Sequence, residues 1–98
     1  MAQKPRGLKA AGTRLWTTVN AEFDLDNEPH KLEILTHACR VSDTVAQLER
    51  AAAKEPLTAV GSAKQLVIHP LIAEVRAQRA LLAQLIARLN FEGQDEVQ

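Results

Sequence analysis

The sequence predicts a mainly α-helical chain with three helices and one short β-hairpin. Ala and Leu, two strong helix formers, dominate the composition of the 98 residues. Apolar residues recur at steps of three and four along two long segments, and each segment begins at a proline, which suits the first turn of a helix. We therefore expect helices over about residues 12–23, 27–54 and 70–90, and a hairpin over about 57–69.

The first helix is expected to begin beside Thr13, whose hydroxyl can cap it. Leu15, Val19 and Phe23 follow at spacings of four and form its apolar face. The preceding residues 1–11 carry basic side chains and little periodicity, so they are interpreted as a flexible basic arm.

The second helix is expected to follow Asp26 or Asn27, either of which can cap it, and to end at Glu55 because the residue before Pro56 resists helical geometry. At 1.5 Å per residue it would be about 40 Å long, which is long for a domain of this size. A heptad seam runs along it, and the third helix repeats the spacing from Pro70 onward. Gly93 is a plausible stop for the third helix.

Two helices with such wide apolar stripes leave two interpretations open. The stripes form either an intramolecular core with the first helix or a surface shared between subunits, and the length of the second helix favours sharing. The candidate interface residues are Ile34, Val41, Val45, Leu48, Leu71, Val75, Leu82, Leu85 and Leu89.

The segment "VGSAKQLVIHP" lies between the second and third helices and predicts the hairpin, with residues 57–60 against 65–69 and Gly61 at the turn. An isolated two-stranded hairpin is only marginally stable, so we expect it to lie against a neighbouring subunit. It is not a phosphate-binding loop, because no second glycine precedes Lys64 and no Ser or Thr follows it.

Patterns for other chemistry are also missing, so we expect no cofactor, no metal site and no enzymatic activity. A calcium loop counted from Asp24 would place Pro29 and Leu35 where Gly and Glu are required. His37 and Cys39, two residues apart on a helix, point to nearly opposite sides. The single cysteine and the lack of an apolar run near eighteen residues suit a soluble protein of a reducing compartment, with no membrane partner.

The charges are polarised along a chain whose formal net charge is zero. The first fourteen residues hold four cations and no acid, whereas residues 22–28 hold four acids and no base, and the last seven residues are acidic. A zero net charge argues against a generally basic nucleic-acid binder, but such an asymmetry can mark an interacting arm.

Four segments carry a resemblance to a known family: "GLKAAGTRLWTTV", "EPHKLEILTHACRVSDTVAQLE", the hairpin segment with Gly61, His69 and Pro70, and "LIAEVRAQRALLAQLIARL". In this order, over roughly residues 7–90, they resemble the small subunit of phage terminases, in the branch common among tailed phages of actinobacteria. The sequence departs from that pattern after the third helix, where "LNFEGQDEVQ" replaces a Leu-Gly-Leu turn and a further segment.

The resemblance implies a non-catalytic DNA-packaging protein that works in the cytoplasm of the infected bacterial host. Such a protein assembles as a homo-oligomeric ring, recognises double-stranded phage DNA and presents it to the large terminase subunit. Repeated around a ring, a few cations per chain become a continuous basic rim, for which the candidates are Lys4, Arg6, Lys9 and Arg14, then Lys31 and Arg40 and, on the third helix, Arg76 and Arg79. The acidic tail, with Glu92, Asp95 and Glu96, is a candidate contact for the large subunit or a solubilising segment.

Two other classes of protein stay open from the sequence. A small DNA-binding regulator would be a dimer on a palindromic site, and a helical structural adaptor would have no affinity for DNA. The number of subunits in solution separates a ring from a regulator. The sequence gives neither the subunit number nor the DNA site, nor whether DNA passes through the ring or wraps outside it.

Overall fold

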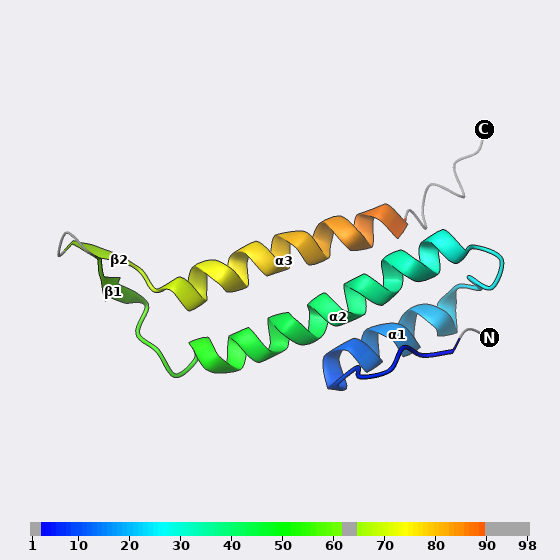
Figure 1. Cartoon of the computed structure of the whole chain (residues 1–98), viewed down its shortest axis with the longest axis horizontal. Helices are drawn as coiled ribbons and strands as arrows, with labels where there is room; N and C mark the ends of the chain where they lie inside the picture. Colours follow the sequence, from blue (N-terminus) through cyan, green and yellow to red (C-terminus); the bar gives the residue numbers. More distant parts are fainter. Residues whose placement is uncertain (1–2, 62–64, 90–98) are drawn as a thin grey trace.

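The computed structural model describes residues 3–61 and 65–89, and it confirms the helical fold with its antiparallel hairpin. The elements follow in the order α1 (Ala10–Glu22), α2 (Pro29–Ala52), β1 (Thr58–Val60), β2 (Leu66–Ile68) and α3 (Pro70–Leu89). The molecule is elongated, with extents of 55 × 33 × 17 Å. α3 runs back along α2, and α1 packs on the other side of α2 (Figure 1).

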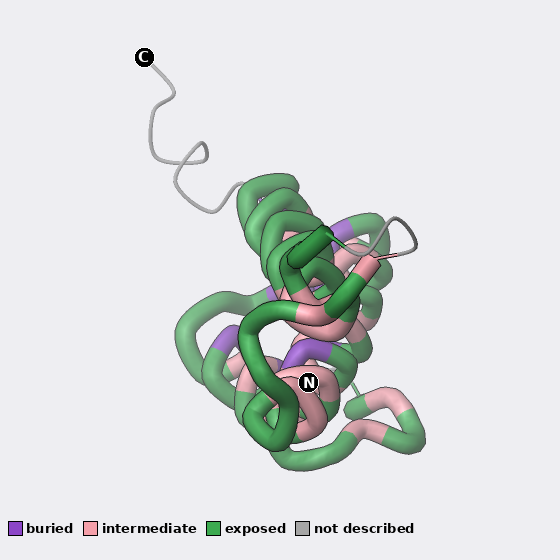
Figure 2. The backbone as a smooth tube through the Cα atoms, turned by 90° about the vertical axis from the view of Figure 1, so that its left-hand side faces the viewer, coloured by how far each residue is buried: buried purple, intermediate pink, exposed green. Residues whose placement is uncertain are grey.

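The hydrophobic core lies at the end of the molecule where all three helices meet. Its buried members come from α1, the loop after it, α2 and the last turn of α3: Trp16, Val19, Leu25, Leu35, Cys39 and Leu89. Buried segments lie among the helices in Figure 2, whereas the residues of the hairpin are exposed or intermediate. The apolar stripes of α2 and α3 therefore pack on each other, and α2 also packs on α1, within one chain.

The predicted subunit interface is wrong at two of its nine positions. Val45 keeps 7% of its surface exposed and Leu89 keeps 1%, so both are buried inside the single chain. The other seven are partly buried along the seam between α2 and α3. The heptad pattern predicts a packing seam, and α2 and α3 do pack on each other. Periodicity alone does not say whether the packing partner belongs to the same chain.

The helix boundaries correct two expectations about capping. α1 begins at Ala10, before Thr13, and Lys9 occupies its N-cap position without a side-chain cap. α2 begins at Pro29 after Glu28, so neither Asp26 nor Asn27 is its N-cap. The predicted proline in the first turn of α2 is confirmed.

The arm is also more ordered than predicted over the residues that the structure describes. Leu8 packs against the core cluster, and the backbone N–H of Lys9 donates a hydrogen bond to Asp43 Oδ2 at 2.7 Å. The Arg40 guanidinium donates to the carbonyl oxygen of Arg6 at 3.3 Å. Phe23, expected on the apolar face of the first helix, follows the end of α1 and is 38% exposed.

The predicted antiparallel hairpin is confirmed, with strands of three residues each. Thr58 pairs with Ile68, Ala59 with Val67 and Val60 with Leu66. It projects beyond the ends of α2 and α3 rather than folding back onto them (Figure 1). Its main contacts are those between its own two strands.

Candidate nucleic-acid interface

Asp43 on α2 fixes the position of the N-terminal arm and the start of α1. Its Oδ2 accepts the hydrogen bond from the Lys9 N–H at 2.7 Å, and its Oδ1 accepts one from the Gly12 N–H at 2.8 Å. These N–H groups lie at the start of a helix, where intrahelical acceptors are lacking and the helix dipole favours an anion. One carboxylate from another helix therefore caps α1.

Gly12 allows the two helices to come this close. A Cβ atom at this position would lie 2.5 Å from Asp43 Oδ2 and 2.6 Å from the carbonyl oxygen of Cys39. Neither distance is tolerated by real Cβ atoms, and the second contact is with backbone that cannot swing away. Gly12 is thus required by close packing of α1 on α2.

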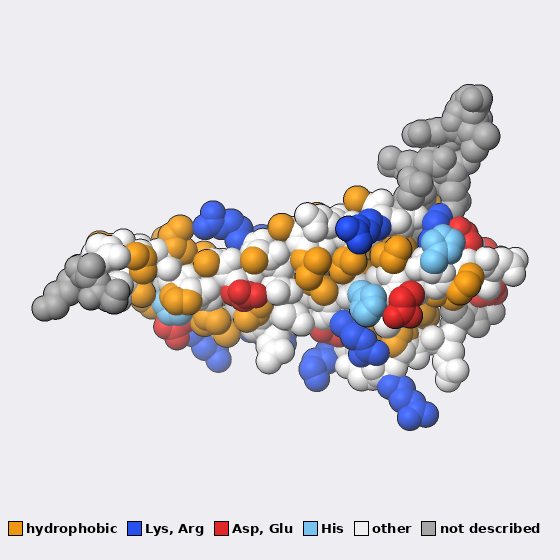
Figure 3. Space-filling model, turned by 45° about the horizontal axis from the view of Figure 1, so that its top comes forward, with side chains coloured by type: hydrophobic (Ala, Val, Ile, Leu, Met, Phe, Trp, Pro, Cys, Tyr) orange, Lys and Arg blue, Asp and Glu red, His pale blue; other side chains and the backbone are white. Residues whose placement is uncertain are grey.

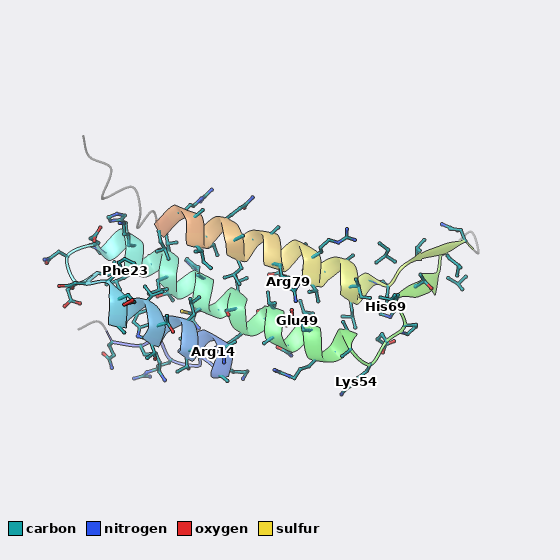
Figure 4. All side chains as sticks on the ribbon, turned by 180° about the vertical axis from the view of Figure 1, so that it is seen from behind. Arg14, Phe23, Glu49, Lys54, His69 and Arg79 are labelled. Carbon is teal, nitrogen blue, oxygen red and sulfur yellow. The ribbon has the colours of Figure 1, made fainter. Side chains whose placement is uncertain are left out.

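The arm, the first half of α1 and the middle of α2 carry five basic side chains, and we call them the basic cluster: Lys4, Arg6, Lys9, Arg14 and Arg40. All five are exposed. The contact between Arg40 and the Arg6 carbonyl joins the α2 member to the arm, and Arg14 extends from α1 (Figure 4). Within residues 3–61 and 65–89, no carboxylate ion-pairs with any of these five cations.

Asp43 does not neutralise the cluster by direct ion pairing. Asp43 directs both of its oxygens to backbone N–H groups. Three other acids lie at the last residue of α1 or just beyond it, where Glu22, Asp24 and Asp26 line an open hollow of about 360 Å³. α1 is 13 residues long, about 20 Å, so the basic and acidic regions are separated along its length.

Lys31 does not belong to this surface, which corrects the prediction that it is a DNA-binding candidate. It is only 7% exposed, and its ammonium lies 3.2 Å from Glu28 Oε1. A phosphate group could reach it only by displacing the residues that cover it. Of the two α2 candidates, Arg40 is the accessible one.

The α3 candidates are placed differently from the basic cluster. Arg79 forms an ion pair with Glu49 across the space between α3 and α2 (Figure 4). Arg76 lies one turn earlier on α3 and is exposed. It lines, together with Glu49 and Arg79, an open groove between α2 and α3. Glu92, Asp95 and Glu96 lie outside the residues that the structure describes.

Cys39 is chemically unreactive although the charges of Arg40 and Asp43 both act on it. It is fully buried, and desolvation by burial, with a smaller contribution from the Asp43 charge, raises its pKa from 9.0 to about 11. Arg40 acts in the opposite direction and lowers it. The thiol is therefore protonated at neutral pH and packs as a small apolar group.

The described part of the chain contains neither a candidate metal site nor a candidate membrane span. No group of three or more His, Cys, Asp or Glu side chains there is arranged to hold a metal ion. No helix in that part is both long and apolar enough to span a membrane.

Sequence reasoning identified the basic side chains but missed the two residues that position them. These are Asp43 and Gly12, which form no recognisable motif in the sequence. The available signal was a glycine next to two alanines inside a helical pattern, which indicates close approach of backbone. Nothing in the local sequence links it to an acid 31 residues away.

Comparison with protein-family models, with curated proteins and with solved structures finds no match for this chain.

Proposed function

We propose that this chain is a non-catalytic DNA-packaging protein of the terminase small-subunit type. It binds double-stranded phage DNA as a homo-oligomeric ring in the cytoplasm of the infected bacterial host and presents the DNA to the large terminase subunit. The observation that supports this proposal best is the basic cluster, because its cations are exposed and free of ion pairs within the described residues.

A monomer with five cations binds DNA weakly and without sequence preference. Each phosphate that is neutralised lowers the logarithm of the binding constant by about 0.9 per tenfold increase in salt. A ring repeats the cluster once per subunit, so that many weak contacts act together on one duplex. The acidic side chains at the C-terminal end of α1 repel phosphate groups, so DNA is expected to lie along the arm and the start of α1.

The arm acts as a positioned element rather than a free tether. Because Asp43 holds the backbone of Lys9 and Gly12, the cations of the arm are kept near Arg40 and Arg14. Holding charges in place before binding reduces the ordering cost of association. This distinguishes the proposal from a disordered basic leader, which would have to become ordered on the DNA.

The test is to neutralise the arm and to measure DNA binding against salt. In the triple variant Lys4→Gln, Arg6→Gln, Lys9→Gln, three phosphate contacts per chain are removed, so the salt slope is expected to become shallower by about 2.7 per chain that contacts DNA. The matched control replaces three exposed cations elsewhere, Arg50, Lys54 and Arg88, by Gln.

The proposal requires the first triple to weaken binding and flatten the salt slope, while the control leaves both near the values of the unmodified chain. Unchanged affinity and slope in the arm triple would contradict it, and so would equal losses in the two triples, which would show a general charge effect. The mass in solution tests the second part of the proposal, because a ring contains many subunits whereas a dimeric regulator contains two.

A further inference from the structure

One imidazole lies where the hairpin meets the two long helices. His69 connects β2 to α3, and its side chain is 19% exposed. The ring contacts Glu55 in the turn after α2 and Leu71 in the first turn of α3. Figure 3 shows histidine and acidic side chains side by side at the hairpin end of the molecule, with apolar side chains around them. A single side chain therefore links the hairpin to both helices.

The sequence places a proline directly after each partner of this contact. Glu55 precedes Pro56 at the entrance to the hairpin, and His69 precedes Pro70 at its exit. A residue before proline is disfavoured in helical geometry, so the chain leaves the helices at these two positions. The turn after α2 is closed by the Glu55 N–H, which donates to the Ala52 carbonyl oxygen at 3.0 Å. This turn holds the Glu55 carboxylate opposite the ring, with Oε1 at 3.3 Å from His69 Nε2.

His69 occupies the N-cap position of α3. Its carbonyl oxygen accepts hydrogen bonds from the Ile72 N–H at 3.0 Å and the Ala73 N–H at 3.2 Å, which are the first bonds of the helix. Its side-chain Nδ1 accepts a third hydrogen bond, from the Leu71 N–H at 3.1 Å. Ser, Thr, Asp and Asn are the residues preferred for this task. Histidine performs it here with a ring that can gain a proton near neutral pH, unlike Ser, Thr or Asn.

The two contacts fix the tautomer of the neutral ring. A ring nitrogen that accepts a hydrogen bond carries no hydrogen, so Nδ1 is bare and Nε2–H donates to Glu55. Protonation leaves Nε2 unchanged and adds a hydrogen to Nδ1, which faces the Leu71 N–H. Two donors cannot form this contact, and the helix dipole disfavours a positive charge at the N-terminus of α3. The protonated ring is therefore drawn toward Glu55 and away from Leu71.

Among the described residues, Glu55 is the charged side chain that contacts the ring. The first turn of α3 contains no acid, and Glu74 in the following turn is hydrogen-bonded within α3. The strands β1 and β2 carry no charged residue. Lys54, beside Glu55 in the turn after α2, is exposed and forms no ion pair with it within the described residues. The Glu55 carboxylate is thus the partner of the ring when the ring is charged.

We propose that His69 is a pH-sensitive clasp between the hairpin and α3. The neutral ring caps α3 and fixes the hairpin relative to it, whereas the charged ring keeps Glu55, releases Leu71 and loosens the first turn of α3. The hairpin itself stays paired, because its base is closed by the backbone N–H of His69, which donates to the Leu57 carbonyl oxygen at 2.9 Å. The main contacts of the hairpin are between its own strands, so the clasp controls its angle to the helices.

The first test is amide hydrogen exchange of the full chain, measured by NMR at about pH 8 and about pH 5, which bracket the range in which histidine ordinarily titrates. Each rate is divided by the rate of an unstructured peptide at the same pH to give a protection factor. The proposal requires the protection of the Leu71 N–H to fall about five- to tenfold at the lower pH, as expected for the loss of an N-cap. The protection of the His69 N–H, at the base of the hairpin, should change by less than about twofold.

Two variants identify the groups responsible. His69→Asn keeps a side-chain oxygen that can cap α3 and gains no proton in this range, so its Leu71 protection should be the same at both pH values. Glu55→Gln keeps an acceptor for Nε2–H but removes the charge that favours the protonated ring, so the fall should occur at lower pH. Constant Leu71 protection in the unmodified chain overturns the proposal, as does an equal fall in His69→Asn. An unmoved midpoint in Glu55→Gln overturns the role of Glu55.

The second test follows the angle of the hairpin. Residual dipolar couplings of the Ala59 and Val67 N–H groups report how the hairpin is oriented relative to α3. The proposal requires these couplings to shrink relative to those of α3 at the lower pH in the unmodified chain and not in His69→Asn. Couplings that fit one common orientation at both pH values overturn the clasp. Neither test uses DNA or self-association, so this inference goes beyond the proposed function, and each can fail without the other.

Discussion

We expect the loss of the contact between Asp43 and the start of α1 to lower the stability of the candidate interface more than the loss of any other contact described there. The carboxylate accepts hydrogen bonds from the N–H groups of Lys9 at 2.7 Å and Gly12 at 2.8 Å. Asp43→Asn keeps one acceptor oxygen and removes the charge. Hydrogen bonds to charged groups contribute about 1.5–3 kcal/mol each, and an anion at a helix N-terminus adds about 0.3–1 kcal/mol.

Because the bond to Lys9 is exposed to water and the bond to Gly12 is partly buried, we expect a loss toward the lower end of these ranges. Asp43→Asn should lower the free energy of unfolding by about 2 kcal/mol, and Asp43→Ala, which keeps no acceptor, by about 3 kcal/mol. Both values are large for a small domain, whose total stability is about 5–15 kcal/mol.

Urea unfolding followed by the fluorescence of Trp16 measures this loss, since Trp16 is the single tryptophan and is buried in the core cluster. The matched control is Asp24→Asn, because the Asp24 carboxylate accepts only a local, exposed hydrogen bond from the N–H of Asp26 at 3.0 Å. We expect the control to change stability by less than about 0.5 kcal/mol. If Asp43→Asn costs no more than Asp24→Asn, the carboxylate does not hold α1, and the argument for a positioned arm fails with it.

Three further predictions follow from the described contacts. Gly12→Ala should destabilise the chain by about 1–3 kcal/mol, because the new methyl group would overlap Asp43 and the Cys39 carbonyl; a stabilised variant would mean that helix propensity outweighs the close approach. Raising the pH from 9 to 11 should lower the free energy of unfolding by about 2 kcal/mol more in the unmodified chain than in Cys39→Ala, because the unfolded thiol loses its proton first while the folded thiol has a pKa of about 11; parallel pH profiles would contradict the burial argument. Breaking the exposed pair between Arg79 and Glu49 by Arg79→Ala should cost less than about 1 kcal/mol in urea unfolding, and a loss above 2 kcal/mol would show that this pair fixes α3 on α2.

The fold was predictable because its signals are local. Proline at the start of α2 and α3, and apolar spacings of three and four, depend only on the geometry of one helix, and both helices form close to where they were expected. The hairpin was predictable for the same reason, since the β-prone residues on both sides of Gly61 pair as two antiparallel strands.

The candidate site was less predictable because its organisation depends on contacts distant in sequence. The cap of α1 comes from α2, 31 residues away, so the local candidate Thr13 was the wrong choice. Lys31 carries the same charge as Arg40, but its position on α2 buries it beside Glu28. Charge patterns name the possible contacts, and only the packing of helices shows which of them reach the surface.

Burial differs between the two ends of the molecule, although α2 and α3 pack on each other along their length. The end with α1 has three layers and buries its apolar side chains, including Leu35 and Leu89. The opposite end has only two helices, and its seam residues Leu71 and Val75 are partly buried beside an open groove. This end lacks a third layer. Two helices packed on each other bury only the faces that meet, so their other faces stay open to solvent. The hairpin, which starts from the same end, is too small to be stable alone.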